Sequence, residues 1–484
     1  MRLHLLAAAT ALTLALAGCA SSGGMHPDGT ALDAASLKAG HSLAGVPLSP
    51  AAWPTSDWWS ALGDPQLDAL ISEALRNNPG LAVADARARG AQAQVGIADA
   101  ARGPSVTGGA SVAGARLPAD VPFGNGHFGL AKYADVSFKW GVDLWGGKRD
   151  AWQAALGASR AAQIDAHAAR IELSGNVARA YAQLGYAFAQ QDLAAGELKR
   201  ANQSLELTQQ RVSAGIDNQI VLKQGDGEVA SAEQDAAVTA RAVDAARSAL
   251  SVLLGKGPDR GLEITRPRVL TPAELAVPAN LSIDLLGHRA DLVAARWRVE
   301  AAGKDIKAAK TEFLPNISIS AMAGVIALGG GSPLSLPSRF FEGGPSLSLP
   351  IFDGGRLRAN LAGKDAQYDL AVAQYNQTLV GALNEVADDV SALQSLQQQM
   401  QAQQRAQTAA RQAWDLALQR YKAGIGSYLE ALSVRQQLLL ANRGMAALQA
   451  QQVDRSVLLI EALGGGYQPQ AEAPTPPSSS PSHS

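Results

Sequence analysis

The feature that most constrains this chain is a pattern of strand, glycine turn and very long helix that occurs twice. Tyr133–Trp145 alternates between apolar residues and polar or small ones, which is the period of two of a strand with one buried face. A Gly-Gly turn follows, and then a run without proline to Arg211. The pattern recurs as the strand Pro345–Phe352, another Gly-Gly turn and a second proline-free run to Tyr421. At about 1.5 Å per residue, each run predicts a helix of roughly 100 Å, too long for an ordinary globular core.

Both proline-free runs carry apolar residues at alternating spacings of three and four. This 3.5-residue period favours left-handed supercoiled packing of helices. The composition agrees with tight helix packing, because 47% of the residues are hydrophobic but only 5% are aromatic. In the second series, the position between Val386 and Leu393 that should be apolar is occupied by Asp389. The two series are Leu173, Val177, Ala180, Leu184 and Ala187, and then Val372, Tyr375, Leu379, Ala382, Val386, Leu393, Leu396 and Met400.

The first residues are typical of an exported protein. Leu5–Leu16 is a short apolar stretch behind Arg2, which predicts a signal peptide and is too short for a transmembrane helix. The single cysteine, Cys19, ends the sequence Leu-Ala-Gly-Cys, which resembles a bacterial lipobox whose cysteine becomes the lipidated first residue. Ala20 follows it, which in such lipoproteins favours sorting to the outer membrane. The alternative is an incidental cysteine beside an ordinary cleavage site.

Equivalent segments of the two halves are separated by a nearly constant number of residues. Gly354 follows Gly146 by 208 positions, and Leu463 follows Leu254 by 209. Such a constant displacement indicates an internal duplication. The expected organisation is a signal peptide (1–18), a lipidated linker (19–64), a first repeat (65–256), a connector (257–280), a second repeat (281–464) and a disordered Pro/Ser tail (465–484).

Four strands are expected, each near the length that a tilted strand needs to cross a bilayer. Four strands leave two open edges, which cannot lie in hydrocarbon, and bacterial barrels have about eight strands or more. Two copies would give eight strands with a filled interior, whereas three would give twelve and a lumen. The alternative is a soluble α+β protein with a small sheet. The strands are Ser105–Ala115, Tyr133–Trp145, Asn316–Val325 and Pro345–Phe352, and the residues expected to face lipid are Val136, Phe138, Trp140, Val142 and Leu144.

The duplicated frame and its motifs resemble the outer-membrane efflux protein family, in its lipoprotein branch of TolC-like, NodT/OprM-type channels. The resemblance covers about residues 53–464. It implies a mainly α-helical homotrimer, with a twelve-stranded transmembrane β-barrel continued by a twelve-helix periplasmic α-barrel. One departure is Ala290, where the family usually has proline, so the bend there must form without it. The motifs are Trp58-Trp59, Gly63-Asp64-Pro65, Phe313-Leu314-Pro315, Arg420-Tyr421 and Ala423-Gly424-Ile425.

The resemblance implies an exit duct of a tripartite pump that exports drugs and other toxic small molecules. Its partners would be a periplasmic adaptor, an inner-membrane transporter and outer-membrane lipid. Two alternatives are the outer-membrane channel of a type I protein secretion system and a periplasmic coiled-coil adaptor lipoprotein, which would have one helical hairpin and no duplication. No catalytic residue, metal or cofactor is predicted, because the seven histidines never pair at metal spacing. The net charge of −2 does not indicate a nucleic-acid surface.

The candidate functional residues lie at the helix ends. The segments Ala214-Gly215-Ile216 and Ala423-Gly424-Ile425 follow the long helices and predict two hairpin turns, which the resemblance assigns to adaptor docking. The resemblance also places a closing constriction past the second turn, where the family tends to carry two acidic residues one turn apart. Glu430 matches the first and Ser433 takes the place of the second. The alternative is that Glu430 is a solvated surface carboxylate. Glu385, Asp388 and Asp389 line either the lumen or a solvated outer face.

Overall fold

The computed structural model describes residues 21–44, 46–47, 53–116, 118, 128–270, 272, 277–278, 281–328 and 335–468. The expected signal peptide and the expected lipidation site, Cys19, lie outside these residues. Of the expected tail, only residues 465–468 are described, directly after the last helix.

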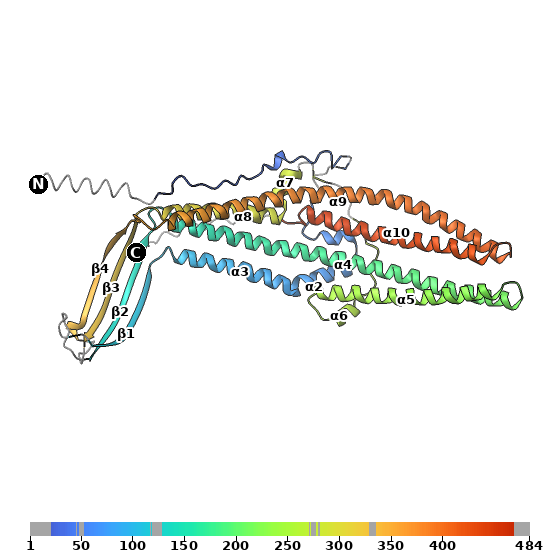
Figure 1. Cartoon of the computed structure of the whole chain (residues 1–484), viewed down its shortest axis with the longest axis horizontal. Helices are drawn as coiled ribbons and strands as arrows, with labels where there is room; N and C mark the ends of the chain where they lie inside the picture. Colours follow the sequence, from blue (N-terminus) through green and yellow to red (C-terminus); the bar gives the residue numbers. More distant parts are fainter. Residues whose placement is uncertain are drawn as a thin grey trace, which may run out of the picture. The chain divides into compact units, whose positions relative to one another are not determined.

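Four antiparallel strands form one sheet in the order β1-β2-β3-β4 (Figure 1). The central pairing joins the two halves of the sequence, with Val136 of β2 opposite Ala323 of β3. The outer strands β1 and β4 each have one neighbour among the described strands, so the sheet of a single chain has two open edges. The strands are β1 (Ser105–Arg116), β2 (Phe128–Val142), β3 (Asn316–Leu328) and β4 (Arg339–Ser348).

The second strand differs from the expectation at both of its ends. It begins earlier, and it ends at Val142, so Leu144 lies outside the sheet. The cause is Asp143, whose side chain accepts hydrogen bonds from the backbone N–H groups of Lys148 (3.0 Å) and Arg149 (2.9 Å). This carboxylate caps the next helix, so the chain leaves the sheet although the alternation of residue types continues.

The fourth strand lies nearer the N-terminus than the expected Pro345–Phe352 and ends at Ser348. Asp353 plays the part that Asp143 plays in the first repeat. Its side chain accepts hydrogen bonds from the N–H groups of Gly355 (3.0 Å) and Leu357 (2.8 Å). An aspartate before the glycine turn therefore ends the extended segment in both repeats. The other two strands begin where we expected them.

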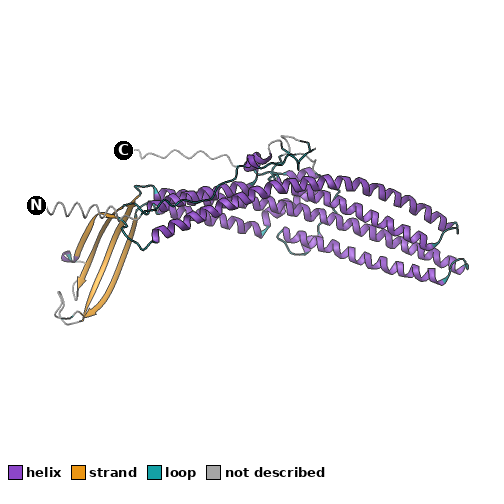
Figure 2. Cartoon of the chain, turned by 45° about the horizontal axis from the view of Figure 1, so that its top comes forward, coloured by secondary structure: helices purple, strands orange, loops and turns teal. Residues whose placement is uncertain are grey.

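Two long helices, each followed by a shorter antiparallel one, form two hairpins (Figure 2). α4 (Gly147–Ser213) and α9 (Arg356–Lys422) have 67 residues each, about 100 Å at 1.5 Å per residue, so the prediction of two very long helices is confirmed. α5 (Gln219–Leu253) and α10 (Tyr428–Ala462) return along them. Most of the heptad positions are buried, as the period predicted. Within the described ranges, no helix has both the length and the apolar character that a membrane span requires.

The shorter helices begin with α2, whose N-cap is Asp64 as predicted; Gln66 donates its backbone N–H to that side chain over 2.9 Å. The structure also contains 3₁₀ helices of three or five residues. The bounds are α2 (Pro65–Asn77), α3 (Pro79–Ala100), α6 (Asp259–Leu262), α7 (Leu281–His288) and α8 (Ala290–Thr311), with η1 (Ala34–Ser36), η3 (Trp58–Leu62) and η4 (Leu336–Ser338).

The bend between α7 and α8 forms at Arg289 without proline. The Arg289 guanidinium donates to Asp291 through two nitrogens, over 3.1 and 2.6 Å. It also donates to the backbone carbonyl of Ala462, over 3.2 Å. The Asp291 carboxylate in turn accepts the N–H of Leu292 (2.8 Å) in the first turn of α8. Side-chain hydrogen bonds thus hold the bend, which forms without the proline that the resemblance led us to expect.

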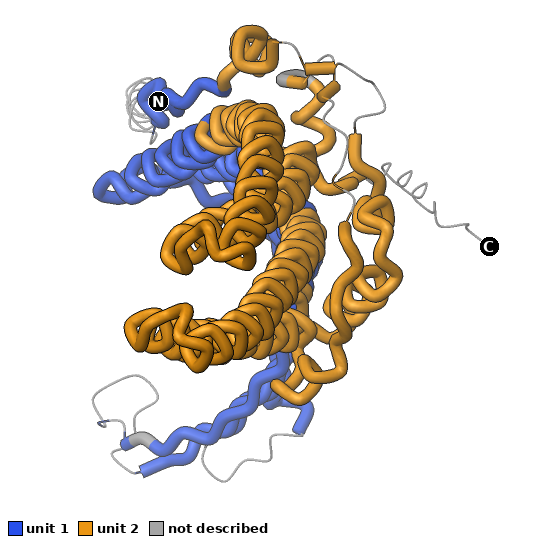
Figure 3. The backbone as a smooth tube through the Cα atoms, turned by 90° about the vertical axis from the view of Figure 1, so that its right-hand side faces the viewer, with its two compact units in different colours: residues 1–31, 86–163, 294–376 blue, residues 32–85, 164–293, 377–484 orange. Residues whose placement is uncertain are grey.

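The chain divides into two compact units, which Figure 3 colours separately. Unit 1 (Met1–Ala31, Ala86–Gln163, Ala294–Asn376) contains the sheet, and unit 2 (Leu32–Asp85, Ile164–Val293, Gln377–Ser484) contains both hairpin turns. The cluster of buried side chains in unit 1 is Ile306, Ala309, Phe313, Leu357 and Leu361. The larger core of unit 2 includes Leu62, Leu67, Ile71, Val177, Tyr181, Leu184 and Leu250.

The N-terminal part of the expected linker packs on α9 within unit 1. Arg358 donates to the carbonyl of Ser21 over 2.9 Å. Gly29 donates its N–H to the Asp369 carboxylate over 2.6 Å. Met25 lies against the apolar cluster of this unit. This segment is therefore held on the protein by hydrogen bonds and apolar contact.

Candidate functional site

The sheet has an apolar face, because directly opposed residues of neighbouring antiparallel strands share a face. Phe138 lies opposite Val106 and Ala321, and Trp140 lies opposite Ile319. Val136 and Val142 share this face, so four of the five residues expected to face lipid lie on it together; Leu144 does not. Large side chains of this face are exposed in the single chain, including Phe341 (89%) and Leu347 (69%).

The opposite face of the sheet is polar. Lys139 lies opposite Ser105 and Ser320. The hydroxyl groups of Thr107 and Ser137 are hydrogen-bonded over 2.7 Å. A second hydroxyl pair, Ser318 and Ser346, is hydrogen-bonded over 2.8 Å. The sheet can therefore separate an apolar surrounding from an aqueous one.

The two hairpin turns have the same backbone geometry at equivalent positions. Gly215 and Gly424 have φ values of 72° and 76°, in the left-handed region that favours glycine. The next residue closes each turn: Ile216 donates its N–H to the carbonyl of Arg211 over 2.9 Å, and Ile425 to that of Arg420 over 3.1 Å. These are the bonds of a Schellman motif, which satisfies the last carbonyl groups of a helix. Both Ala-Gly-Ile segments thus form the turns expected of them.

Glu430 lies in the first turn of α10. Its backbone N–H donates to the Ser427 hydroxyl over 3.1 Å, so Ser427 is the helix cap. Its carboxylate is exposed and lies 3.8 Å from Arg420 Nε at the end of α9. Ser433 is also exposed, further along the same helix. A negative charge at this position is favourable for the N-terminal end of a helix.

A half-buried ion pair of the first hairpin is hydrogen-bonded to the second hairpin behind the turns. The Arg211 guanidinium pairs with Asp217 over 2.7 Å, and the Tyr421 hydroxyl donates to the same carboxylate over 3.1 Å. The guanidinium carbon of Arg211 also lies 4.7 Å from the centre of the Tyr421 ring. The hydrogen bond from Arg211 holds the pKa of Asp217 below its ordinary value. The first hairpin is thereby fixed to the second through Asp217.

A second network joins the hairpins further from the turns. The buried Glu197 of α4 accepts hydrogen bonds from Arg200 (2.7 Å) and from Arg435 of α10 (2.5 Å). Burial raises the pKa of Glu197, but the two arginines outweigh it and lower the pKa overall. Arg200 also pairs with Glu228, which accepts the Tyr428 hydroxyl. Each charged side chain of this network is therefore neutralised by a partner from another helix.

The sequence reasoning did not single out Arg211, Asp217, Glu197 or Arg435. One signal was available, since Asp217 follows the first Ala-Gly-Ile turn directly and Tyr421 lies just before the second. Hairpins that pack side by side bring such positions together. Which carboxylate pairs with which cation depends on helix rotation, which the heptad does not fix.

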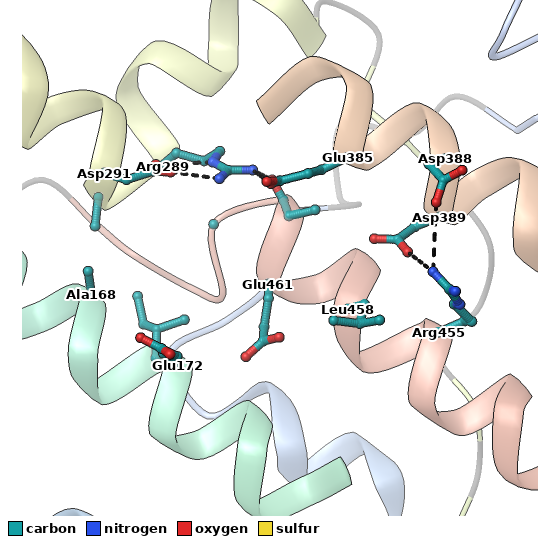
Figure 4. Close-up of a pocket in the computed structure, with 14 residues that line it drawn as sticks. Ala168, Glu172, Arg289, Asp291, Glu385, Asp388, Asp389, Arg455, Leu458 and Glu461 are labelled. Atoms are coloured by element: carbon teal, nitrogen blue, oxygen red, sulfur yellow. Dashed lines mark hydrogen bonds and ion pairs between the residues drawn. The ribbon is translucent and has the colours of Figure 1, made fainter. Parts of the chain in front are cut away.

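The three other acidic candidates lie around a cavity in unit 2 and are paired with arginines (Figure 4). Glu385 is 2.7 Å from Arg289. Arg455 lies 3.2 Å from the buried Asp389 and 3.7 Å from the exposed Asp388. Asp389, the polar residue within the heptad pattern of α9, is thus the ion-pair partner of Arg455 on α10.

A profile of the outer membrane efflux protein family matches residues 70–256 and, separately, residues 281–465. The fusaric acid resistance protein FusA of Burkholderia cepacia is 36% identical over 367 residues, which cover 74% of this chain and 69% of FusA. The multidrug resistance outer membrane protein MdtP of Escherichia coli K12 is 30% identical over 434 residues, 87% of this chain and 89% of MdtP.

The fold is similar to that of a solved outer membrane protein. The crystal structure of VceC from Vibrio cholerae superposes with a TM-score of 0.79 at 34% identity. The match covers 86% of this chain and 100% of VceC.

Proposed function

The chain belongs to the outer membrane efflux protein family, and from that premise we propose that it is the outer-membrane exit duct of a tripartite efflux pump. The observation that carries this proposal is the sheet, with its exposed apolar face and its two open edges. Open edges in hydrocarbon leave backbone groups without partners, so strands there must close into a barrel. Four strands per chain are too few, since bacterial barrels have about eight or more.

Three chains supply the strands for a barrel with a lumen. In this trimer, β1 of one copy pairs with β4 of the next, and twelve strands close with their apolar faces towards lipid. Eight strands would enclose only packed side chains. The polar face around Ser137 and Lys139 then lines the lumen. The two hairpins of each chain provide four helices, and three chains continue the duct as a twelve-helix periplasmic barrel.

The domain organisation follows from the duplication. We assign the first repeat to residues 65–256, the connector to 257–280 and the second repeat to 281–464, which agrees with the two separate profile matches. Cys19, the first residue of the linker, is the proposed lipid anchor. Cys19→Ser should abolish incorporation of labelled palmitate, and wild-type protein that takes up no label would contradict the anchor.

The partners and the cargo follow from the ends of the duct. The hairpin turns expose Ile216 (61%) and Ile425 (73%), an apolar contact for a periplasmic adaptor that links the duct to an inner-membrane transporter. Glu430, with Ser433 one turn on, forms the proposed periplasmic gate. Because the names of FusA and MdtP refer to resistance to fusaric acid and to multiple drugs, we assign toxic small organic molecules as the cargo.

A gene deletion tests this function against protein secretion. Cells without this chain should become sensitive to toxic small molecules, and the wild-type gene should restore their resistance. Their secretion of proteins should stay unchanged. Unchanged sensitivity together with lost protein secretion would instead identify a type I secretion channel.

A further inference from the structure

A cavity of about 590 Å³ in unit 2 lies between α4, the start of α8, α9 and α10 (Figure 4). Carboxylates from all four elements line it, and two arginines stand among them. Within the described part of the chain, no group of three or more His, Cys, Asp or Glu side chains is arranged to hold a metal ion. The six carboxylates are Glu172, Asp291, Glu385, Asp388, Asp389 and Glu461.

Both arginines are already engaged by other carboxylates. Arg289 pairs with Asp291 (2.6 Å) and Glu385 (2.7 Å). Arg455 pairs with two aspartates of α9, as the dashed lines in Figure 4 show. Glu461 is therefore left without an arginine partner in this part of the structure.

The carboxyl group of Glu461 is packed against α4. Its Oε1 atom is buried and has no hydrogen-bond partner among the residues that the structure describes. The group lies directly on Gly175, where a methyl group would overlap Oε1. A glycine in the middle of a long helix weakens it, so its place here is explained by this contact.

Charged groups face Glu461 from every surrounding element, and most are negative. Arg179 of α4 is the cation whose charge acts on Glu461, but it is bound to Asp454 over 2.7 Å. Burial is the main cause that raises the pKa of Glu461 to about 7, with smaller contributions from the charges of Glu172, Asp389 and Asp454 and a lowering by Arg179. These groups are Glu172 and Arg179 on α4, Asp454 and Arg455 on α10, Glu385, Asp388 and Asp389 on α9, and Arg289 and Asp291 at the start of α8.

We propose that Glu461 is a proton-dependent latch between α10 and α4: the protonated carboxyl lies against Gly175, and its ionisation breaks this contact and loosens the two helices. An ionised carboxylate without donors is far more costly to bury than a neutral acid. The ionised carboxylate of Glu461 is then hydrated in the adjoining cavity, either in place or after its side chain rotates. This inference goes beyond the exit-duct function and does not depend on it.

The direction of the pH effect follows from proton linkage. The folded protein holds the proton of Glu461 more tightly than the unfolded chain, whose pKa is the ordinary 4.5. The stability of the contact therefore falls as the pH rises from 4.5 through about 7, and it is constant above that. Each pH unit in this window weakens the contact by up to about tenfold.

Two measurements on the full-length protein in detergent test the latch. The infrared band of protonated carboxylic acid should disappear with a midpoint near pH 7, and Glu461→Gln should lack this component. Hydrogen exchange of the amides around Gly175, corrected for the intrinsic pH dependence, should accelerate by up to about tenfold per pH unit over the same range. In Glu461→Gln it should stay constant.

Three variants separate the latch from a general effect on folding. Glu172→Gln removes a neighbouring negative charge and should move the midpoint to lower pH. Gly175→Ala displaces the carboxyl and should move it further in the same direction. Glu206→Gln, at an exposed site on α4, should leave the midpoint unchanged. If Glu461→Gln does not fold, the shift in Glu172→Gln decides. A band already absent at pH 6, or a midpoint unaltered by Glu172→Gln, would overturn the latch.

Discussion

At the scale of single residues, the link between the hairpins depends on Asp217. Tyr421→Phe removes one of the two residues that donate to its carboxylate, a net loss of about 1.5–3 kcal/mol for a hydrogen bond to a charged group. The variant should unfold at a lower temperature and open more often in planar bilayers. Because Arg211 lowers the pKa of Asp217, this contribution is complete above the ordinary pKa of 3.8 and is lost only as the pH falls through the lowered value. A difference in Tm that varied between pH 5 and 8 would contradict this assignment.

Glu430 is the residue for which the gate is tested most directly. Three copies around a narrow axis would repel one another, which favours a bound cation. Glu430→Gln should therefore weaken both the cation preference of the channel and its block by divalent ions, while Glu385→Gln should do less. The nearby Arg420 offsets part of the charge, so Arg420→Gln should strengthen cation preference. Unchanged selectivity in Glu430→Gln would leave Glu430 an ordinary surface carboxylate.

At the scale of secondary-structure elements, caps decide where elements begin. Asp64 accepts hydrogen bonds from the backbone of Gln66 and Arg268 and from the Tyr181 hydroxyl. Asp64→Ala should cost about 1–3 kcal/mol, since it leaves buried donors unpaired. Burial raises the pKa of Asp64, but its donors outweigh burial and lower it overall, so the loss should be full above pH 3.8 and shrink in stronger acid. Urea unfolding at several pH values measures this loss in the free energy of unfolding. Asp57, whose side chain makes no cap bond, is the control, and an equal loss in Asp57→Ala would refute the role of the cap.

The same caps explain which element boundaries the sequence could predict. The long helices were predictable because apolar periodicity persists over many turns and no proline interrupts it. The strand ends at Val142 and Ser348 were not, because alternation continues past them. An aspartate side chain that caps the next helix marks the end of each extended segment. Asp143 resembles any other polar residue of the alternating pattern, and Asp353 lies just beyond it. The turns at Gly215 and Gly424 were predictable, since each has glycine where a left-handed backbone is required.

At the scale of the whole molecule, the sequence alone revealed the duplication, whereas the contacts between the two repeats required the structure. The duplication was visible in one sequence, because two displaced copies of a pattern can be compared directly. The pairing of β2 with β3 then places the two repeats in one sheet. The hydrogen bond from Tyr421 to Asp217 and the contact of Glu461 with Gly175 could not be derived, since they depend on how helices from the two repeats are rotated against each other.

The trimer is the prediction on which the proposed duct depends. A chain with two open sheet edges should be extracted by detergent as a trimer, and native mass measurement should find three copies. Phe138→Arg places a charge on the apolar face and should cost about 2–4 kcal/mol near the bilayer midplane. It should therefore reduce the trimer fraction and the heat stability of what remains. Lys139→Gln is the matched control, because it changes a charge on the polar face of the same strand. A wild-type protein that is monomeric or dimeric would exclude the twelve-stranded barrel, and equal losses in both variants would exclude the assignment of the two faces.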